Sequence, residues 1–319
     1  MANHSVSRPV TIWSDGTRLV GDLWSPSDLA PDAQVPGVLL VHGYGGRREQ
    51  LNNAYARKFA ALGCIVLCFD YRGYGDSAGK LVRVDERSAE DAEGEFDARV
   101  QEVREVVDNL DQLEDVRSAL AFLMGEPQVD ANRIGIWGSS NGGGLAMATA
   151  CQFEEIKVLI TQVGSLNPQV LLRWYDAGEP VPNADRMKSA RESWEERIAL
   201  ARGDKSPLLT PVAAAGSPKQ YAIRGALDWD RYRRYDPMRD LDSLHAASLI
   251  IDAEEEELFD TAYNGQELYE RIRDRMPARY EKIPGTHYDV YSGEGYRAAL
   301  ALEKEWLSKH LIGGIGDKE

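Results

Sequence analysis

Residues 138–142 carry the pattern Gly-x-Ser-x-Gly, with Ser140 at its centre. An apolar run from Ile134 precedes the pattern and a run of small, apolar residues follows it, which predicts a strand, a sharp turn and a helix. Such a turn is strained, requires glycine on both sides and lifts the serine hydroxyl out of the sheet. The chemistry expected of this serine is nucleophilic attack on an acyl carbon. A glycine-rich turn can also bind phosphate or serve packing alone, so the prediction depends on partner residues.

A serine nucleophile needs a base, and the chain contains five histidines. His287 follows a strand-like run and lies in a glycine-bearing loop ahead of the last predicted helix. That position puts it at the edge of the sheet where the Ser140 turn is expected, so we predict that His287 is the base. A structural loop histidine is the alternative. The remaining histidines lie in the N-terminal tail, after the first central strand, before a later strand and in the last helix, at positions 4, 42, 245 and 310.

An acid must hold the base in the correct tautomer, and it is expected after the strand at residues 249–252. This strand continues into Glu254-Glu255-Glu256-Glu257, a run that is usually a solvated turn. One carboxylate a few residues past the strand end can meet an imidazole from the next strand and loop. Its position relative to the strand end selects Glu256. The alternatives are Asp252, Glu255, Glu257 and, more remotely, Asp228.

Attack on an acyl carbon also requires amide donors for the developing oxyanion. The amide of Asn141, directly after Ser140, is one predicted donor. The other is the amide of Tyr44, in the loop His42-Gly43-Tyr44-Gly45-Gly46, where glycines allow a close approach of the backbone. Metal binding by His42 is a weak alternative, because no second cluster of ligand residues has suitable spacing. We expect no metal and no cofactor.

The elements that position these residues alternate between strand and helix. Apolar strands are predicted at 38–41, 65–69, 134–138, 158–163, 248–252 and 279–283, and helices at 48–62, 113–123, after Ser140 and at 295–310. This alternation is typical of an α/β fold with a doubly wound, mainly parallel sheet. Residues 10–24, with Asp15-Gly16 at the turn, predict an antiparallel hairpin before it. The segment 88–107 is ambiguous.

The alternation stops between residues 167 and 244, a segment rich in proline and aromatic residues. We interpret it as a cap inserted over the site, with residues 1–166 and 245–319 as the core; a loose surface excursion is the alternative. Trp174, Tyr221 and Trp229 are the predicted substrate contacts in the cap. Its arginines are candidates to meet an anionic group, although a solvated surface is favoured for them: Arg224, Arg231, Arg233, Arg234 and Arg239.

The composition is that of a soluble globular protein with a formal charge of −15, which argues against nucleic acid or an anionic membrane surface as a partner. There is no signal-peptide core and no apolar run of membrane-spanning length. Cys64 and Cys68 share one predicted strand, roughly 13 Å apart, too far for a disulfide. These features predict a cytoplasmic protein with a small-molecule ester substrate. The sequence leaves open whether the chain forms a homodimer.

These motifs together resemble the α/β-hydrolase superfamily, whose triad order is serine, acid, histidine. The chain is most similar to the dienelactone-hydrolase-like and prolyl-peptidase or cocaine-esterase-like groups, which often carry Asp-x-Arg-Gly-x-Gly-x-Ser, here Asp70 to Ser77. Dienelactone hydrolases proper use cysteine as the nucleophile, and most relatives place aspartate where Glu256 stands.

We therefore predict a serine hydrolase that cleaves carboxylic esters through an acyl-enzyme, with Ser140, His287 and Glu256 as its triad. A peptidase, an amidase or a C–C bond hydrolase with the same triad is the alternative within enzymes. A binding member of the fold that does not turn over is a third hypothesis, of a different class.

Overall fold

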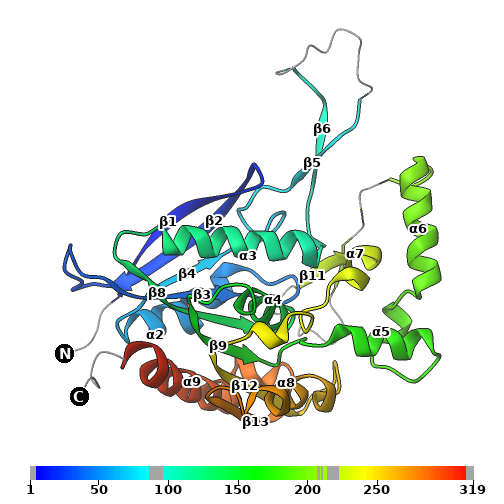
Figure 1. The fold of residues 1–319 in the computed structure, drawn as a ribbon. Coiled ribbons are helices and arrows are strands. Elements are labelled where there is room, and N and C mark those ends of the chain that lie inside the picture. Colours follow the sequence, from blue (N-terminus) through cyan, green and yellow to red (C-terminus); the bar gives the residue numbers. More distant parts are fainter. Residues whose placement is uncertain (1–4, 86–95, 207–208, 210, 214–222, 314–319) are drawn as a thin grey trace.

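The centre of the fold is one large sheet, seen in Figure 1. The computed structural model describes residues 5–85, 96–206, 209, 211–213 and 223–313. The strands of the large sheet are β1 (Ser5–Ser14), β2 (Thr17–Pro26), β3 (Val35–Val41), β4 (Ile65–Phe69), β8 (Val129–Ser139), β9 (Ile156–Gln162), β12 (Ala247–Glu255) and β13 (Ala278–Thr286). They lie in the order β1-β2-β4-β3-β8-β9-β12-β13. The first two strands run antiparallel to their neighbours and all later pairs are parallel.

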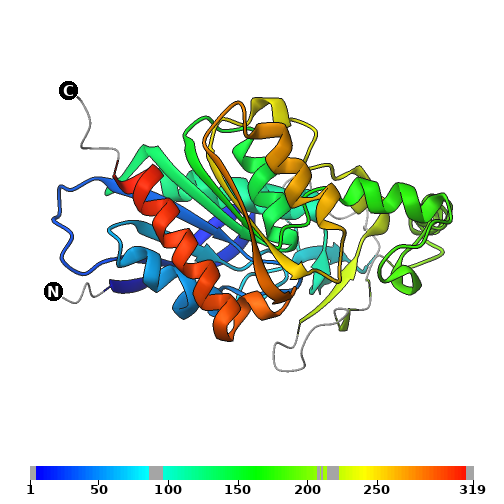
Figure 2. The same ribbon diagram turned by 90° about the horizontal axis from the view of Figure 1, so that it is seen from below.

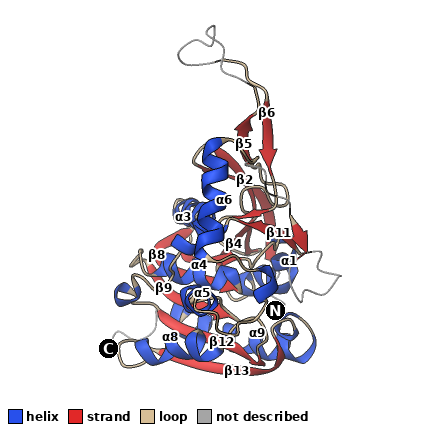
Figure 3. Cartoon of the chain, turned by 90° about the vertical axis from the view of Figure 1, so that its right-hand side faces the viewer, coloured by secondary structure: helices blue, strands red, loops and turns tan. Residues whose placement is uncertain are grey.

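The predicted doubly wound, mainly parallel sheet with an N-terminal hairpin is confirmed. The hairpin turns at Asp15 and Gly16, whose φ angles of 45° and 74° suit a tight two-residue connection. Small strands outside the large sheet are β5 (Lys80–Arg83), β6 (Val100–Val103), β7 (Val106–Val107), β10 (Val212–Ala213) and β11 (Arg224–Leu227). Figure 3 shows the β5–β6 hairpin projecting from the body of the molecule.

Helices cover both faces of the sheet. They are α1 (Arg48–Leu51), α2 (Arg57–Ala60), α3 (Asn109–Met124), α4 (Asn141–Ala150), α5 (Pro168–Asp176), α6 (Ala190–Arg202), α7 (Trp229–Arg234), α8 (Gly265–Ile272) and α9 (Gly293–Leu307). Figure 2 shows α9 (red) beside the α1–α2 region, where the Tyr296 hydroxyl bonds to the backbone of Ala54. Single helical turns lie at Ala184–Arg186, Leu241–Ser243, Thr261–Tyr263 and Asp289–Tyr291, and π turns at Asn52–Ala56 and Ser308–Ile312.

The apolar strands are buried on both faces, which explains their uninterrupted hydrophobic sequence. In β3, Leu39 and Val41 join one core cluster with α3 and α4, while Val38 and Leu40 join the other with α2 and α9. Cys64, Cys68 and Cys151 are buried and free.

Two parts of the chain differ from the sequence prediction. The helix expected over 48–62 is divided by the π turn Asn52–Ala56, where Asn52 bonds to Trp24 and Asp22 of the hairpin. The ambiguous segment supplies β6 and β7, and its residues 88–95 lie outside the described part of the chain. Residues 167–244 add no described strand to the large sheet; they form α5, α6, α7 and short strands instead.

The Asp70–Ser77 motif connects β4 to its surroundings. Asp70 is fully buried; its carboxylate accepts hydrogen bonds from the Arg48 backbone amide and guanidinium. Arg72 donates three bonds to buried Asp115, two from its guanidinium at 2.9 and 2.7 Å and one from its backbone amide at 2.9 Å. Ser77 donates to the Asp70 carbonyl and accepts from the amide of Val20. These contacts give the motif a structural role: they fix the turn after β4 against the hairpin and α3.

Candidate active site

Ser140 lies at the sharp turn between β8 and α4. Its backbone angles, φ 53° and ψ −125°, fall in a region that side-chain-bearing residues rarely adopt. The turn persists because Ser140 donates its amide to Gln162 and accepts from the amides of Gly143 and Ser165, each at 2.9 Å. A Cβ on Gly142 would lie 2.5 Å from the carbonyl oxygen of His42, so only glycine fits there. The local sequence therefore presents the Ser140 hydroxyl at the carboxyl end of the sheet.

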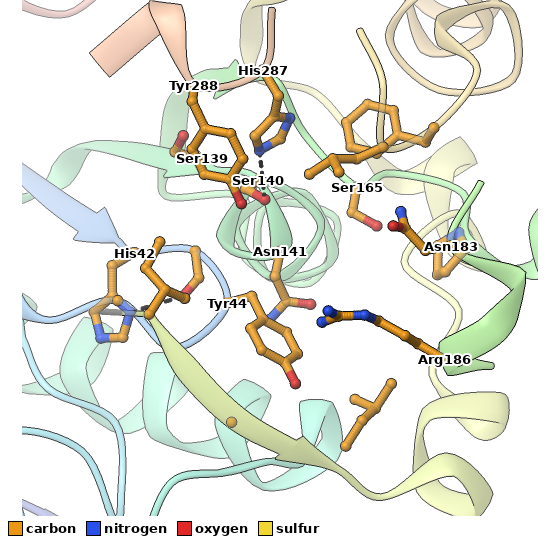
Figure 4. Close-up of a pocket in the computed structure, with 18 of the residues that line it drawn as sticks. His42, Tyr44, Ser139, Ser140, Asn141, Ser165, Asn183, Arg186, His287 and Tyr288 are labelled. Carbon is orange, nitrogen blue, oxygen red and sulfur yellow. Dashed lines mark hydrogen bonds between the residues drawn. The ribbon is translucent and has the colours of Figure 1, made fainter. Parts of the chain in front are cut away.

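His287 is placed next to that hydroxyl by the loop after β13. Its Nε2 atom lies 3.1 Å from Ser140 Oγ (Figure 4). The ring is 2% exposed and packs edge-on against Phe259. Its backbone amide donates to the Glu257 carboxylate at 2.8 Å. Both the backbone and the ring of His287 are thus held in place.

Glu256 completes the group from the loop after β12. Both of its carboxylate oxygens lie 2.9 Å from His287 Nδ1, and its side chain is 2% exposed. One of these oxygens also accepts from the amide of Leu258 at 3.0 Å. A carboxylate at Nδ1 places the ring proton there and leaves Nε2 free to accept from a hydroxyl.

The other carboxylates considered for this role have different partners. Asp252 is buried beneath the site and accepts a bond from the Tyr280 hydroxyl at 3.0 Å; burial raises its pKa to about 7. Asp228 caps α7 by accepting from the amide of Arg231. Glu255 is exposed, and Glu257 binds the His287 backbone. The structure therefore brings Glu256, rather than these four, to the imidazole.

The loop at residues 42–46 lies directly beside Ser140. A Cβ on Gly43 would come within 3.0 Å of Ser140 Cβ, so the loop backbone is in close contact with the turn. Tyr44 and Asn141 line the same pocket as Ser140, and Asn141 begins α4. The Asn141 side chain is fixed by Asn109, which donates to it at 2.7 Å. Both residues whose amides are predicted donors therefore border the same pocket as Ser140.

His42 has a structural setting. Its ring is 2% exposed, its Nδ1 donates to the carbonyl of Gly43 at 3.1 Å, and burial lowers its pKa. The ring also packs against Tyr71 at 4.1 Å. Within the described ranges no group of three or more His, Cys, Asp or Glu side chains is arranged to hold a metal ion. None of the described helices is long and apolar enough to cross a membrane.

A pocket of about 770 Å³ opens above Ser140. Apolar and aromatic side chains dominate its lining, and many of them come from the 167–244 segment: Pro168, Leu171, Leu172, Pro182, Met187, Val212, Ile223, Leu227, Trp229 and Tyr232. Such a pocket suits a substrate with an apolar portion.

The three aromatic residues predicted to contact substrate have different outcomes. Trp229 lines the pocket. Tyr221 lies outside the described residues. Trp174 does not line the pocket; its ring packs edge-on against Tyr263 instead. The α5 residues that line the pocket, Pro168, Leu171 and Leu172, lie in the first half of this helix, and Trp174 lies further toward its C-terminal end.

One polar residue of the pocket was missed by the sequence analysis. Arg186 lines the pocket from the end of the turn Ala184–Arg186, whereas the cap arginines considered earlier are mostly ion-paired outside it. A lone arginine in an irregular segment carries no periodic or motif signal. The sequence analysis interprets residues 167–244 as a cap but does not single out Arg186 within them.

Comparisons with known proteins agree with this architecture. The profile of the acetyl xylan esterase family (AXE1) matches residues 13–168. An uncharacterized 31.7 kDa protein of Escherichia coli, from the traX-finO intergenic region, is 23% identical over 289 residues, covering 86% of this chain and 91% of that protein. The monoacylglycerol lipase of Mycolicibacterium smegmatis is 23% identical over 309 residues, covering 93% and 95%. Among solved structures, the α/β hydrolase GrgF from Penicillium sp. sh18 superposes with a TM-score of 0.69 at 17% identity, over 96% of this chain and 99% of GrgF.

Proposed function

We propose that this chain is an α/β hydrolase that cleaves carboxylic esters through an acyl-enzyme on Ser140. The observation that carries the proposal is the pair of contacts at His287, 3.1 Å to Ser140 and 2.9 Å to Glu256. Similarity to acetyl xylan esterase and to a monoacylglycerol lipase supports ester chemistry.

In the first step Ser140 Oγ attacks the ester carbonyl carbon, and His287 Nε2 takes the hydroxyl proton. Glu256 holds the Nδ1 proton in place and stabilises the imidazolium that forms. The amides of Tyr44 and Asn141 receive the negative oxygen, each donor of this kind contributing roughly 10²–10³ in rate. The carbon–oxygen bond to the alcohol then breaks, and His287 returns its proton to that leaving group.

In the second step water attacks the acyl carbon while His287 Nε2 accepts a proton from it. The bond to Ser140 Oγ breaks, the serine regains its proton from His287, and the carboxylic acid leaves. No group beyond this chain and water is required for either step. The 167–244 segment acts in this proposal as a cap that selects substrates, because it supplies Trp229 and much of the remaining lining.

Labelling with a fluorophosphonate probe tests the proposal. The wild-type chain should form a covalent adduct that Ser140→Ala does not form. Ser139→Ala is the matched control, because Ser139 is the adjacent serine but bonds to Gln162 and Tyr291 rather than to His287. An adduct that persists in Ser140→Ala, or no adduct with the wild type, overturns the proposal.

A substrate panel separates esterase from peptidase activity, which the same three residues can support. Para-nitrophenyl esters should be cleaved with kcat/KM well above that of the matching aminoacyl anilides. The reverse order would favour the peptidase or amidase alternative. A probe adduct without turnover of any substrate would favour the binding member of the fold.

A further inference from the structure

Arg186 is the one charged side chain in the described lining of the pocket, the two histidines aside. No aspartate or glutamate of the described residues contributes to that lining. A single cation in a largely apolar cavity is a recognition element, because a charged group there needs an ionic partner, supplied either by the protein or by a bound ligand.

The guanidinium of Arg186 is anchored but keeps donors available. Its Nη1 atom donates to the carbonyl of Ala213 at 2.8 Å, and its backbone amide donates to Asn183 at 3.0 Å. The following residue is held in turn by Tyr175, whose hydroxyl donates to the Met187 carbonyl at 3.1 Å. A guanidinium has five N–H donors in a planar fork, so one anchoring bond leaves a donor edge for a carboxylate.

Arg186 also differs from the neighbouring arginines in its ionic partners. Arg231 pairs with Asp108 and Asp111, and Arg233 pairs with Asp176 at 2.7 Å. Arg186 has no acidic partner among the residues that the structure describes. The sequence of residues 214–222, which follows Ala213, contains no acidic residue either. Among the described residues, the charge of Arg186 is therefore not neutralised by an acidic side chain, unlike the charges of Arg231 and Arg233.

The position of Arg186 relative to His287 indicates which part of an ester it meets. Figure 4 shows His287 on one side of Ser140 and Arg186 on the other, extending toward Asn141 and Tyr44. In the proposed reaction the leaving oxygen must lie at His287 Nε2, which protonates it. The acyl chain then points away from His287, into the part of the pocket where Arg186 lies.

We propose that Arg186 binds an anionic group on the acyl part of the substrate, so that the preferred esters are half-esters of dicarboxylic acids. The inference rests on the proposed ester hydrolysis and names its substrate class. Tyr44 supports it as a second donor: burial raises the pKa of its hydroxyl to about 12, so the hydroxyl stays protonated at neutral pH. Figure 4 shows Arg186 extending toward Tyr44, so both groups lie in the same part of the pocket.

The test compares para-nitrophenyl esters that differ only in the end of the acyl chain. Mono-para-nitrophenyl adipate is paired with the hexanoate ester, and the suberate half-ester with the octanoate ester, so that each pair exchanges a methyl for a carboxylate. Longer half-esters are used because the shorter ones cleave themselves. The kcat/KM ratio of anionic to neutral ester is measured for the wild type, Arg186→Gln, Arg186→Lys and Arg173→Gln. Arg173→Gln is the control, because it removes the same charge from an exposed residue of α5 that does not line the pocket.

We expect Arg186→Gln to lower the ratio about tenfold for at least one pair, with the neutral ester changed less than threefold. Arg186→Lys should recover part of the ratio, and Arg173→Gln should leave it unchanged. An unchanged ratio in Arg186→Gln for both pairs overturns the inference. An equal loss on both esters also overturns it, because Arg186 would then act on the oxyanion or on the fold.

A binding measurement separates failure of the inference from failure of the proposed function. Two proteins, Ser140→Ala and the double variant Ser140→Ala/Arg186→Gln, are each titrated calorimetrically with adipate and with hexanoate. Weaker adipate binding in the double variant, with hexanoate unaffected, supports the anion site even if the wild type cleaves no ester. Equal adipate affinity in both variants counts against the site, whatever the ester activity.

Discussion

His287 Nδ1 lies 2.9 Å from both carboxylate oxygens of Glu256, while the backbone amide of His287 donates to Glu257 at 2.8 Å. Two adjacent glutamates thus hold different parts of His287: Glu256 fixes its ring and Glu257 fixes its main chain. The ring and the Glu256 side chain are each 2% exposed, so water does not compete for their contact. A four-glutamate run that resembles a solvated turn therefore contains two residues with defined partners.

Glu256→Gln should lower kcat/KM for a para-nitrophenyl ester by about 10²–10⁴-fold. The amide can still accept from Nδ1 but carries no charge to stabilise the imidazolium that forms when Ser140 is deprotonated. The measurement is steady-state hydrolysis, with thermal unfolding to verify that the variant is folded. Glu254→Gln is the control, because Glu254 is exposed in the same run and should leave activity within twofold.

The alternative acid is buried Asp252, which lies on β12 four residues before Glu256. If Asp252→Asn abolished activity while Glu256→Gln retained most of it, the acid would be Asp252 and the arrangement at His287 would have to change in the working enzyme. The two variants together assign the role.

Gly142→Ala should remove folded, soluble protein or lower the free energy of unfolding by more than about 3 kcal/mol. Its Cβ would lie 2.5 Å from the His42 carbonyl oxygen and also against the Val41 carbonyl, and neither backbone atom can move cheaply. Urea unfolding measures the effect. At the control position Gly125 a Cβ would lie 3.4 Å from its nearest neighbour, so Gly125→Ala should change stability little. Equal effects at both positions would contradict the steric argument.

The strands that are buried on both faces could be located from the sequence alone. β3 and β4 are apolar throughout, and β9 is apolar at Val158, Leu159 and Ile160, because both faces are buried there, so these strands could be located without knowing their neighbours. Parallel strands end at the same edge of the sheet. The residues directly after β8, β12 and β13 therefore had to meet there, which is why Ser140, Glu256 and His287 were found.

The sequence did not predict those features whose position depends on contacts between residues far apart in the chain. The π turn Asn52–Ala56 follows from bonds between Asn52 and the hairpin, which no local pattern encodes. Trp174 contacts Tyr263, a residue far away in the sequence, and no local pattern encodes that contact. Arg186 is placed by Asn183, which adopts a left-handed φ of 56°, and by its bond to Ala213, so its role could be inferred only from the structure.

Arg72→Met should destabilise the fold by roughly 3–5 kcal/mol, because it leaves the buried Asp115 carboxylate without its cationic partner. Adding Asp115→Asn to the same chain should recover part of the loss, since the uncompensated charge is then gone. Urea unfolding of the two single variants and the double variant gives the coupling free energy. Additive losses would show that the pair contributes no interaction of its own.

Glu303→Gln should become more stable relative to the wild type as the pH rises from 5 to 9. Glu303 is fully buried in α9 and accepts a bond from Trp137 at 2.6 Å; burial raises its pKa to about 8, while the Trp137 bond opposes that rise. Between its usual value near 4.5 and about 8, the folded chain keeps a proton that the unfolded chain has lost, so wild-type stability falls with rising pH. Glutamine cannot ionise, so the stability of the variant does not fall in this way as the pH rises.

The difference in free energy of unfolding between Glu303→Gln and the wild type should therefore grow by up to about 1.4 kcal/mol per pH unit within this window, and level off above it. Urea unfolding at several pH values measures this difference. Glu305→Gln is the matched control, because the Glu305 side chain lies on the same helix but is 63% exposed, and its difference from the wild type should vary little with pH. A constant difference for Glu303→Gln would mean that its carboxylate ionises in the folded chain as it does in water. The bond from Trp137 would then have to offset the whole cost of burial.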